Sequence, residues 1–239
     1  MLPVFKEPCQ SWILPNPIPD EPLTGIELPL CLKAVLIRRG ITNPSDANLY
    51  LNPKELPDPE EHYPDLKLAI KRIKKSIKEK QRITICGDYD ADGMTSTALL
   101  LKALKALKAD VSSAIPNRVE EGYGLNSNIV RKLAKEGTDL IITVDNGVKA
   151  YSSIELANEL EIDVILTDHH VLEGKPPSAL AFIHPSTTPE NSPYRNLAGV
   201  GLAYVIATSL AKEFKIKTII KDSLDLFCLG TIADMAQLN

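Results

Sequence analysis

The stretch Ile83-Thr84-Ile85-Cys86-Gly87-Asp88-Tyr89-Asp90-Ala91-Asp92-Gly93 decides the fold of this chain. Its first four residues are largely apolar and predict a buried strand, and the Ala- and Leu-rich segment 94–107 after it predicts a helix. Three carboxylates therefore stand at one strand end, where they repel one another strongly if water is scarce. A divalent cation such as Mg²⁺ or Mn²⁺ would relieve that repulsion, because hard cations prefer oxygen ligands. The stretch thus predicts a metal at the carboxyl end of a strand, where open α/β sheets bind ligands.

From residue 66 onward, short runs rich in Ile and Val alternate with longer helical patterns. This alternation predicts an α/β fold with a mostly parallel sheet flanked by helices on both faces. The predicted strands are 82–86, 111–115, 139–144, 163–167 and 181–184, and the predicted helices are 66–79, 94–108, 126–136, 150–160, 202–214 and 224–233.

The first 65 residues have a different composition, since twelve of the 18 prolines precede residue 65. Proline interrupts helices and central strands, so we expect a largely irregular, partly helical appendage over 1–65. Its helical pieces are predicted near 30–39 and 45–51, and the α/β domain is predicted over 66–239.

Composition bounds the class of protein. The chain has 239 residues, 44% of them hydrophobic and 24% charged, as is ordinary for a globular protein. Its four cysteines lie far apart without a CxxC pair, which argues against a zinc knuckle or a disulfide framework and favours a reducing compartment. The start lacks the pattern of a signal peptide and no apolar run approaches 18 residues, so we expect a cytoplasmic protein without a membrane span.

The net charge of −4 argues only weakly against nucleic-acid binding, because the distribution of charge matters more than its sum. Eight basic residues fall within 67–82. They are either the solvated face of a helix or a contact to a phosphate backbone.

Two further predicted strands also end in metal-ligand side chains. Asp145-Asn146-Gly147 follows 139–144, and Asp168-His169-His170 follows 163–167. A single Asp at a strand end usually caps a helix or forms a turn. In a parallel sheet, however, all three ends lie on one edge, so these groups converge and favour a metal site.

A calcium EF-hand is excluded as the explanation of Asp88-x-Asp90-x-Asp92-Gly93. That loop needs a Glu six residues after the Gly, and Leu99 occupies this position. The preceding segment is also a strand rather than a helix.

Four motifs together resemble those of the DHH phosphoesterase superfamily: Asp90-x-Asp92, Asp145-Asn146-Gly147, Asp168-His169-His170 and Gly230-Thr231-Ile232-Ala233-Asp234. The longer strings 87–93, 115–118, 121–124 and 197–201 resemble its RecJ branch of single-stranded-DNA exonucleases. The similarity runs from about residue 50 to the last residue.

The resemblance implies two Mn²⁺ or Mg²⁺ ions. It places Asp145 between the ions and Asp90 on one of them, and Asp92, His169 and Asp234 on the other. It also implies that His170 meets the scissile phosphate and that Asp168 orients the imidazoles through a hydrogen bond. Asp88 is an extra ligand, a neighbour of the ligands or a turn carboxylate.

Cys86 is a departure from the family pattern, since many members have a histidine ligand at this position. It is either a soft metal ligand or a buried thiol at a strand end. With a thiol there, we expect the first ion to have fewer protein ligands.

The substrate residues are less sharply defined by the sequence. Arg118 suits a phosphate or a surface salt bridge, and Tyr123 suits a stacked base or a packed ring. Gly199-Val-Gly201 opens a helix that binds phosphate or packs tightly, with Arg195 just before it. His62 and His184 have no partner pattern, so we expect them to be structural or surface residues.

The resemblance implies hydrolysis of single-stranded DNA from the 5′ end in DNA repair and recombination, with repair or replication proteins as partners. The alternatives are a hydrolase for short oligonucleotides, cyclic dinucleotides or pyrophosphate, and a non-catalytic scaffold. RecJ-like proteins normally continue into a DHH-associated domain and an oligonucleotide-binding domain, and we expect both to be absent here.

Overall fold

A computed structural model of the chain describes residues 16–17, 22–52, 56–117, 122–216 and 223–238. It divides into two compact units, Met1–Glu55 and Leu56–Asn239. The larger unit contains a five-stranded sheet with the order β2-β1-β3-β4-β5. Its strands are β1 (Arg82–Cys86), β2 (Asp110–Ala114), β3 (Leu140–Thr143), β4 (Asp163–Thr167) and β5 (Ala181–Ile183). All neighbouring pairs are parallel, which confirms the predicted fold class.

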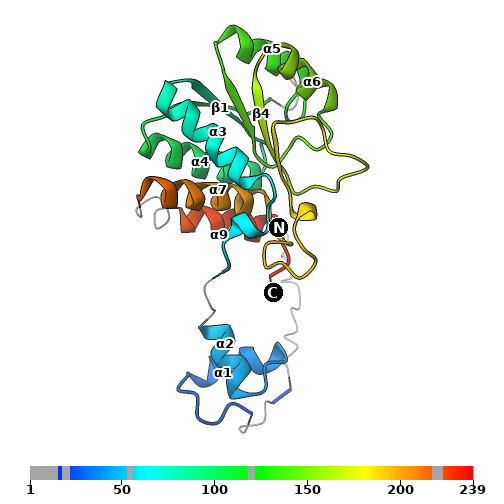
Figure 1. Cartoon of the computed structure of the whole chain (residues 1–239). Helices are drawn as coiled ribbons and strands as arrows, with labels where there is room; N and C mark the ends of the chain where they lie inside the picture. The colour runs from blue at the N-terminus through cyan, green and yellow to red at the C-terminus, as the bar shows by residue number, and fades with distance from the viewer. Residues whose placement is uncertain (1–15, 18–21, 53–55, 118–121, 217–222, 239) are drawn as a thin grey trace, which may run out of the picture. The chain divides into compact units, whose positions relative to one another are not determined.

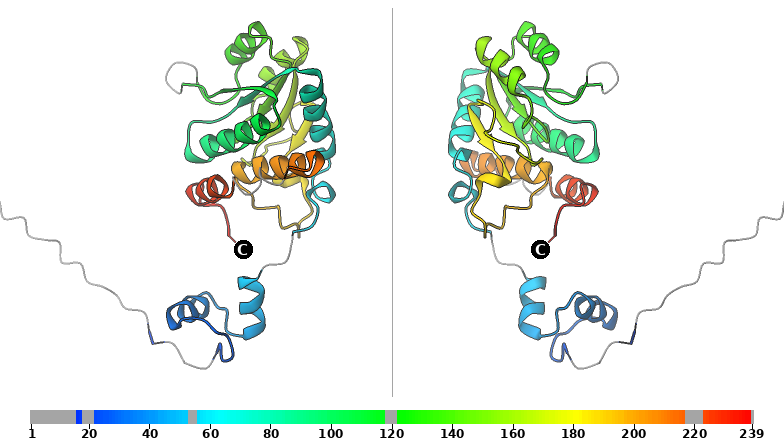
Figure 2. Two further views of the ribbon diagram at one scale, coloured as in Figure 1. Left: turned by 90° about the vertical axis from the view of Figure 1, so that its left-hand side faces the viewer. Right: turned by 90° about the vertical axis from the view of Figure 1, so that its right-hand side faces the viewer.

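Alternate strand residues point to opposite faces of this sheet, so apolar side chains project from both faces. Helices cover both of them. On one face, residues such as Ile85 and Ile142 pack in a core with α3 (Leu66–Glu79), α4 (Ala91–Ala106) and α7 (Gly199–Phe214). On the other, Ile141 and Leu166 pack with α5 (Ser127–Lys135) and α6 (Tyr151–Glu159). Figure 1 shows these two layers around β1 and β4, and Figure 2 shows them from either side.

The strand order places the carboxyl ends of β1 and β3 side by side. The chain leaves β1 through α4 on one face and reaches β4 from β3 through α6 on the other. Such a reversal opens a crevice beyond the strand ends, where open α/β sheets bind ligands. The three acidic strand ends of the sequence therefore come together at this edge.

Two helices begin three residues earlier than predicted. The segment predicted from residue 94 starts at Ala91, and the segment predicted from residue 202 starts at Gly199. Each predicted start is the first strongly apolar residue of its segment. In the structure Asp90 caps α4, and both glycines of Gly199-Val-Gly201 lie in the first turn of α7. The other predicted helices and strands of this unit agree with the structure to within one residue at each end.

The boundary between the units falls at Glu55, ten residues before the predicted one. Residues 56–65 pack against the larger unit, because the fully buried Tyr63 donates its hydroxyl to the carbonyl of Tyr194 at 3.1 Å. The Tyr194 hydroxyl in turn donates to the Pro57 carbonyl, and Lys212 forms an ion pair with Asp58. These contacts come from residues far along the chain, so local composition did not reveal them.

The smaller unit contains the two predicted helices, α1 (Leu30–Arg38) and α2 (Pro44–Leu51). Asn43 caps α2 by accepting the N–H of Asp46 at 2.9 Å. Leu23, Leu36 and Ala47 form a small core of their own.

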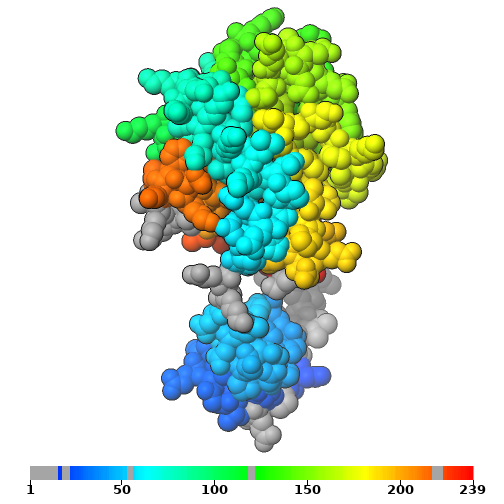
Figure 3. All heavy atoms as spheres, in the orientation of Figure 1, coloured from blue at the N-terminus to red at the C-terminus, as the bar shows by residue number. Residues whose placement is uncertain are grey.

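Helix α3 carries most of the basic cluster. In Figure 3 it lies at the surface, in cyan, beside α7, in orange. Arg72 is structural, since its guanidinium binds Asp163 at the start of β4, on the sheet edge away from the acidic strand ends. Across the described ranges, no helix has the length and apolar character needed to cross a bilayer.

We expect Tyr63→Ala to lower the free energy of unfolding by about 3–5 kcal/mol, because it leaves a cavity in the main core. Tyr63→Phe should lose about 1 kcal/mol, the contribution of one hydrogen bond. Urea denaturation measures both values. Tyr50→Ala is the matched control, because Tyr50 is exposed on α2 and its removal should change stability by less than about 0.5 kcal/mol. Equal losses at Tyr63 and Tyr50 would contradict the assignment of residues 56–65 to the larger unit.

Candidate metal centre

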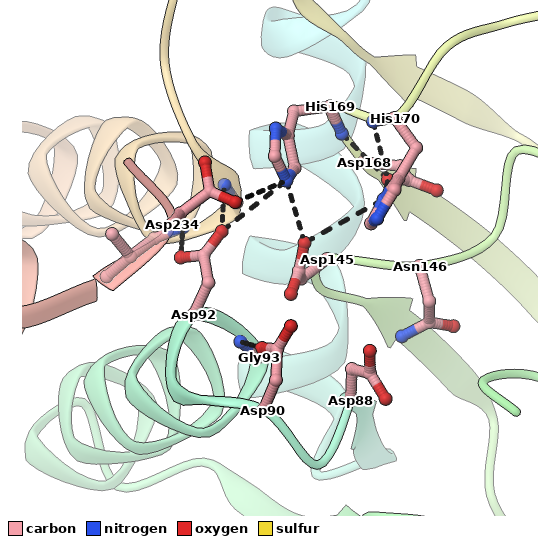
Figure 4. A network of polar contacts seen from close by, with 12 residues as sticks. Asp88, Asp90, Asp92, Gly93, Asp145, Asn146, Asp168, His169, His170 and Asp234 are labelled. Atoms are coloured by element: carbon pink, nitrogen blue, oxygen red, sulfur yellow. Dashed lines mark hydrogen bonds and ion pairs between the residues drawn. The ribbon is translucent and has the colours of Figure 1, made fainter. Parts of the chain in front are cut away.

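Four segments bring acidic and imidazole groups to one place, as Figure 4 shows. Asp88, Asp90 and Asp92 follow β1, and Asp145 follows β3. The Asp168-His169-His170 run follows β4, and Asp234 ends α9 (Leu224–Ala233). The predicted convergence of these side chains is therefore present, although they come from positions across most of the larger unit.

The turn after β1 is shaped by the start of α4. Asp90 caps this helix by accepting the N–H of Gly93 at 2.9 Å. A Cβ at Gly93 would lie 2.6 Å from the Cβ of Asp88, so only glycine allows this close approach. The turn thereby holds the side chains of Asp88 and Asp90 near each other at the sheet edge.

Asp92 is buried and joins two helices. Its carboxylate accepts the N–H of Gly199 at 2.7 Å and the N–H of Val200 at 2.8 Å. Burial raises the pKa of Asp92, although these two hydrogen bonds oppose the shift. The same carboxylate lies 3.5 Å from Nε2 of His169.

This geometry corrects the predicted phosphate site at Gly199 and Gly201. The first N–H groups of α7 already donate to Asp92, and the N–H of Gly201 donates to the carbonyl of Ala198. The packing alternative holds instead, because a Cβ at Gly199 would lie 2.7 Å from the Cβ of Asp145.

Asp145 lies at the centre of the group. It is 1% exposed and adopts a left-handed backbone conformation with φ of 61°, which is costly for a residue other than glycine. Its Oδ1 lies 3.0 Å from Nε2 of His169, yet neither carboxylate oxygen receives a well-formed hydrogen bond from any residue that the structure describes. Burial raises the pKa of this carboxyl to about 7, and its contact with His169 opposes the rise.

The Asp168 carboxylate organises the two imidazoles. It accepts the N–H groups of Val148, His169 and His170, and it binds Nδ1 of His170 at 2.7 Å. These bonds outweigh burial and lower the pKa of Asp168. The hydrogen bond that the His170 ring donates to Asp168, opposed by burial, raises the pKa of His170 to about 9. The predicted orienting role of Asp168 therefore has a direct geometric basis for His170.

Asp234 completes the group from the C-terminal end of α9, with its Oδ1 3.8 Å from Nε2 of His169. Burial disfavours the imidazolium of His169, but the neighbouring carboxylates of Asp145, Asp234 and Asp92 outweigh it and raise its pKa.

Three sets of donor atoms lie close enough to share an ion. Within each set, one atom per residue lies within 4.8 Å of the others: Asp92 with His169 and Asp234, Asp145 with His169 and His170, and Asp88 with Asp90 and Asp145. Asp145 belongs to two sets, and its buried oxygens without hydrogen-bond donors fit a role between two cations. Carboxylate and imidazole ligands suit divalent metals such as Mn²⁺.

Cys86 is turned away from these groups. Its side chain packs in the core with α5 and α6, and burial raises the pKa of its thiol to about 12. A thiol of this kind stays protonated, whereas metal binding needs the thiolate. The structure therefore favours the buried-thiol alternative.

Asn146 and His184 support the centre in ways that the sequence analysis did not find. Asn146 donates to the carbonyls of Cys86 and Val144, and so links the ends of β1 and β3. His184 is buried and its Nε2 lies 2.8 Å from the carbonyl of His170. Its Nδ1 accepts the N–H of Ser186, so Nε2 carries the proton and donates. His184 is thus structural, as expected, but it holds the loop that presents His170.

The predicted substrate residues Arg118, Tyr123 and Arg195 differ in what the structure shows of them. Arg118 lies outside the described residues. Tyr123 is half exposed, and its ring meets the ring of Tyr89 edge to face. Arg195 donates to the carbonyl of Thr188 at 2.7 Å, which favours a structural role in its loop.

A family model described as the DHH family, N-terminal domain, matches residues 82–231. The single-stranded-DNA-specific exonuclease RecJ of Bacillus subtilis (strain 168) is 40% identical over 208 residues, 86% of this chain and 26% of that protein. RecJ of Escherichia coli (strain K12) is 34% identical over 230 residues, 89% of this chain and 38% of that protein.

Two solved structures are similar as well. RecJ from Thermus thermophilus in complex with Mn²⁺ is 31% identical with a TM-score of 0.69, over 85% of this chain and 28% of that one. A structure of exonuclease RecJ bound to manganese is 35% identical with a TM-score of 0.66, over 77% of this chain and 44% of that one. The chain thus spans less than half the length of each of these relatives, and the resemblance found in its motifs is confirmed. Since the family model matches more than half of the chain, from β1 into α9, this protein belongs to the DHH family.

Proposed function

We propose that this chain is the metal-dependent phosphodiesterase part of an exonuclease that hydrolyses single-stranded DNA from the 5′ end. The observation that carries the proposal is Asp145, a buried carboxylate that receives no well-formed hydrogen bond within the described residues. A buried carboxylate without hydrogen-bond donors is expensive in a protein interior, even with the His169 imidazole 3.0 Å away. Two cations, one on either side of Asp145, would remove that cost.

In this proposal Asp92, His169 and Asp234 hold one ion, and Asp90 holds the other, with Asp145 between them. Asp88 lies in the same donor set as Asp90 and Asp145, which supports it as an extra ligand of the second ion. Two bound cations would stabilise the negative charge that builds on a phosphate during hydrolysis.

In this proposal His170 acts on the substrate. Its Nδ1 is bound to Asp168, and its side chain is 46% exposed, so Nε2 is left to face a phosphate oxygen. In the metal-free protein its bond to Asp168 raises the pKa of the imidazole to about 9, which favours the protonated form. Asp168 and His184 are positioning residues, since they fix the ring and the backbone of His170.

The RecJ relatives support single-stranded DNA as the substrate class, because their names state this specificity. These names describe whole proteins, of which this chain spans 26% and 38%. The same proposal includes hydrolysis from the 5′ end, a role in repair and recombination, and repair or replication proteins as partners. So does a cytoplasmic location, which the free thiols of Cys31, Cys86 and Cys228 support.

Asp145→Asn should lower the rate of mononucleotide release by at least about 100-fold, because even a residue that only supports a metal ligand is worth 10- to 100-fold. The measurement is digestion of single-stranded DNA labelled at each end, in Mn²⁺, with pyrophosphate and a cyclic dinucleotide as further substrates. Asp225→Asn is the matched control, since Asp225 is exposed on α9 and outside the centre.

DNA hydrolysis by the unmodified protein and by Asp225→Asn, but not by Asp145→Asn, would support the proposal. Turnover of pyrophosphate or the dinucleotide alone would reassign the substrate. Inactivity of the unmodified protein on every substrate, with Mn²⁺ bound, would indicate a scaffold.

The metal-free protein should lose stability as the pH rises from about 4 to 9. The folded-state pKa of Asp145, about 7, lies above its unfolded value, so ionisation costs stability through this range. His170 acts in the same direction, because the stability that its proton contributes is lost as the pH passes its folded pKa of about 9.

Thermal denaturation in EDTA between pH 5 and pH 9 measures this trend, and added Mn²⁺ should weaken or reverse it. Asp145→Asn should flatten the metal-free trend while abolishing the effect of Mn²⁺. A metal-free protein that gains stability from pH 5 to pH 9 would contradict the electrostatic account of the centre.

A further inference from the structure

Two cavities lie toward opposite ends of the strands. One, of about 540 Å³, adjoins the metal centre beside His170 and belongs to the site already described. The other, of about 860 Å³, lies along α3, and Asp163 at the start of β4 contributes to its wall. The length of β4, roughly 16 Å at 3.3 Å per residue, separates Asp163 from the Asp168 end of the strand. Nothing in the metal-centre chemistry derived above uses this second cavity, which we call the α3 groove.

A row of lysines runs along the α3 groove. Lys67, Lys71, Lys75 and Lys78 are all exposed and follow one another at intervals of three or four residues, so they lie on one face of the helix. The last three of them line the groove. At 1.5 Å per residue the row is about 16 Å long. Positive charges in a row of this length suit an extended polyanion better than a compact anion.

Ion pairs account for only part of the positive charge on α3. Arg72 and Lys74 each pair with a carboxylate of another element, so they are structural. Lys75 has a weak exposed pair within α3, at 4.0 Å. Within the described ranges, no carboxylate lies within ion-pair distance of the other three lysines of the row. These lysines are therefore free to contact a bound anion.

The floor of the α3 groove is apolar. Leu68 is 42% exposed, and Ile77 and Phe214 are only partly buried against the main core. Proteins that bind single-stranded nucleic acid combine a positively charged groove along the backbone with aromatic rings on which bases stack. A duplex, whose bases are already stacked on one another, would leave this apolar surface unused. The groove thus favours a single strand.

We propose that the α3 groove is a second binding site for single-stranded DNA, remote from the metal centre, with Lys71, Lys75 and Lys78 on its phosphates and Phe214 against a base. The inference rests on the proposed function and deepens it, because it names where a part of the strand distant from the reacting end is held. Such a site retains a long strand while its end is hydrolysed, but it does not reach a dinucleotide at the metal centre.

The test is the binding of an oligothymidylate of about 16 nucleotides, measured by fluorescence anisotropy in EDTA so that no metal-bound contact contributes. Lys71→Gln/Lys78→Gln should weaken binding about 10-fold. It should also reduce the slope of log K against log salt concentration by about 1.4, because each phosphate contact on a single strand contributes about 0.7. Lys102→Gln/Lys105→Gln is the matched control, since it removes the same charge from two exposed positions of α4 and should change neither value.

Phe214→Leu tests the stacked base separately. Leucine keeps an apolar side chain against the core but removes the aromatic ring. We expect binding of the oligothymidylate to weaken at least about 5-fold, the contribution of one stacked base, with no change in the salt slope.

Hydrolysis in Mn²⁺ separates this inference from the proposed function. Lys71→Gln/Lys78→Gln should raise KM for the long oligothymidylate about 10-fold and leave hydrolysis of a thymidine dinucleotide unchanged. Absence of binding in EDTA, or equal losses in both lysine double variants, would overturn the inference and leave the proposed function standing. Tighter binding of poly-aspartate than of DNA would overturn it in favour of an acidic protein partner. Binding of DNA through the groove without hydrolysis of any substrate would support the inference and contradict the proposed function.

Discussion

The structure depends on how it holds the negative charge of Asp145. This carboxylate is buried at a sheet edge in a left-handed backbone conformation, with the carboxylate of Asp92 nearby and a glycine, Gly199, packed against its Cβ. Hydrogen bonds from the start of α7 stabilise Asp92, but within the described residues no such donors reach Asp145. The surrounding fold bears both the backbone strain and a buried carboxylate without hydrogen-bond donors, which is typical of sites organised for a ligand rather than for stability.

The elements around Asp145 are arranged to bring backbones close together. Gly93 permits the β1 turn to pass beside Asp88, and Gly199 permits α7 to reach Asp145. Asp92 then joins α4 to α7 through its carboxylate. The same contacts that pack these two helices therefore also fix a metal-ligand candidate. A change in the packing of α4 against α7 would therefore shift Asp92 in the metal centre.

The sequence alone predicts those parts of this arrangement that follow from hydrophobic periodicity and from the side chains at strand ends. The parallel sheet and the grouping of Asp90, Asp145 and His169 follow from runs of Ile and Val that each end in polar ligands. The start of α4 depends on the local cap by Asp90. The start of α7, and the inclusion of residues 56–65 in the larger unit, depend on partners more than a hundred residues away. The supporting role of His184 is hidden for a different reason, since its partner is a backbone carbonyl that no side-chain pattern reveals.

The metal centre and the adjoining cavity differ in the kind of side chain that lines them. Charged groups gather around Asp145, whereas Tyr123 and aliphatic residues form much of the wall of the cavity beyond His170. Asn146 links the two, because it follows Asp145 and holds the loop of Tyr123. Electrostatic stabilisation of a phosphate acts on every phosphodiester alike, so it cannot by itself select a nucleic acid. Selection requires a neighbouring surface that meets the sugar and base, and a rigid link between that surface and the reacting phosphate. Here Asn146 joins the loop of Tyr123 to the residue that carries the central carboxylate.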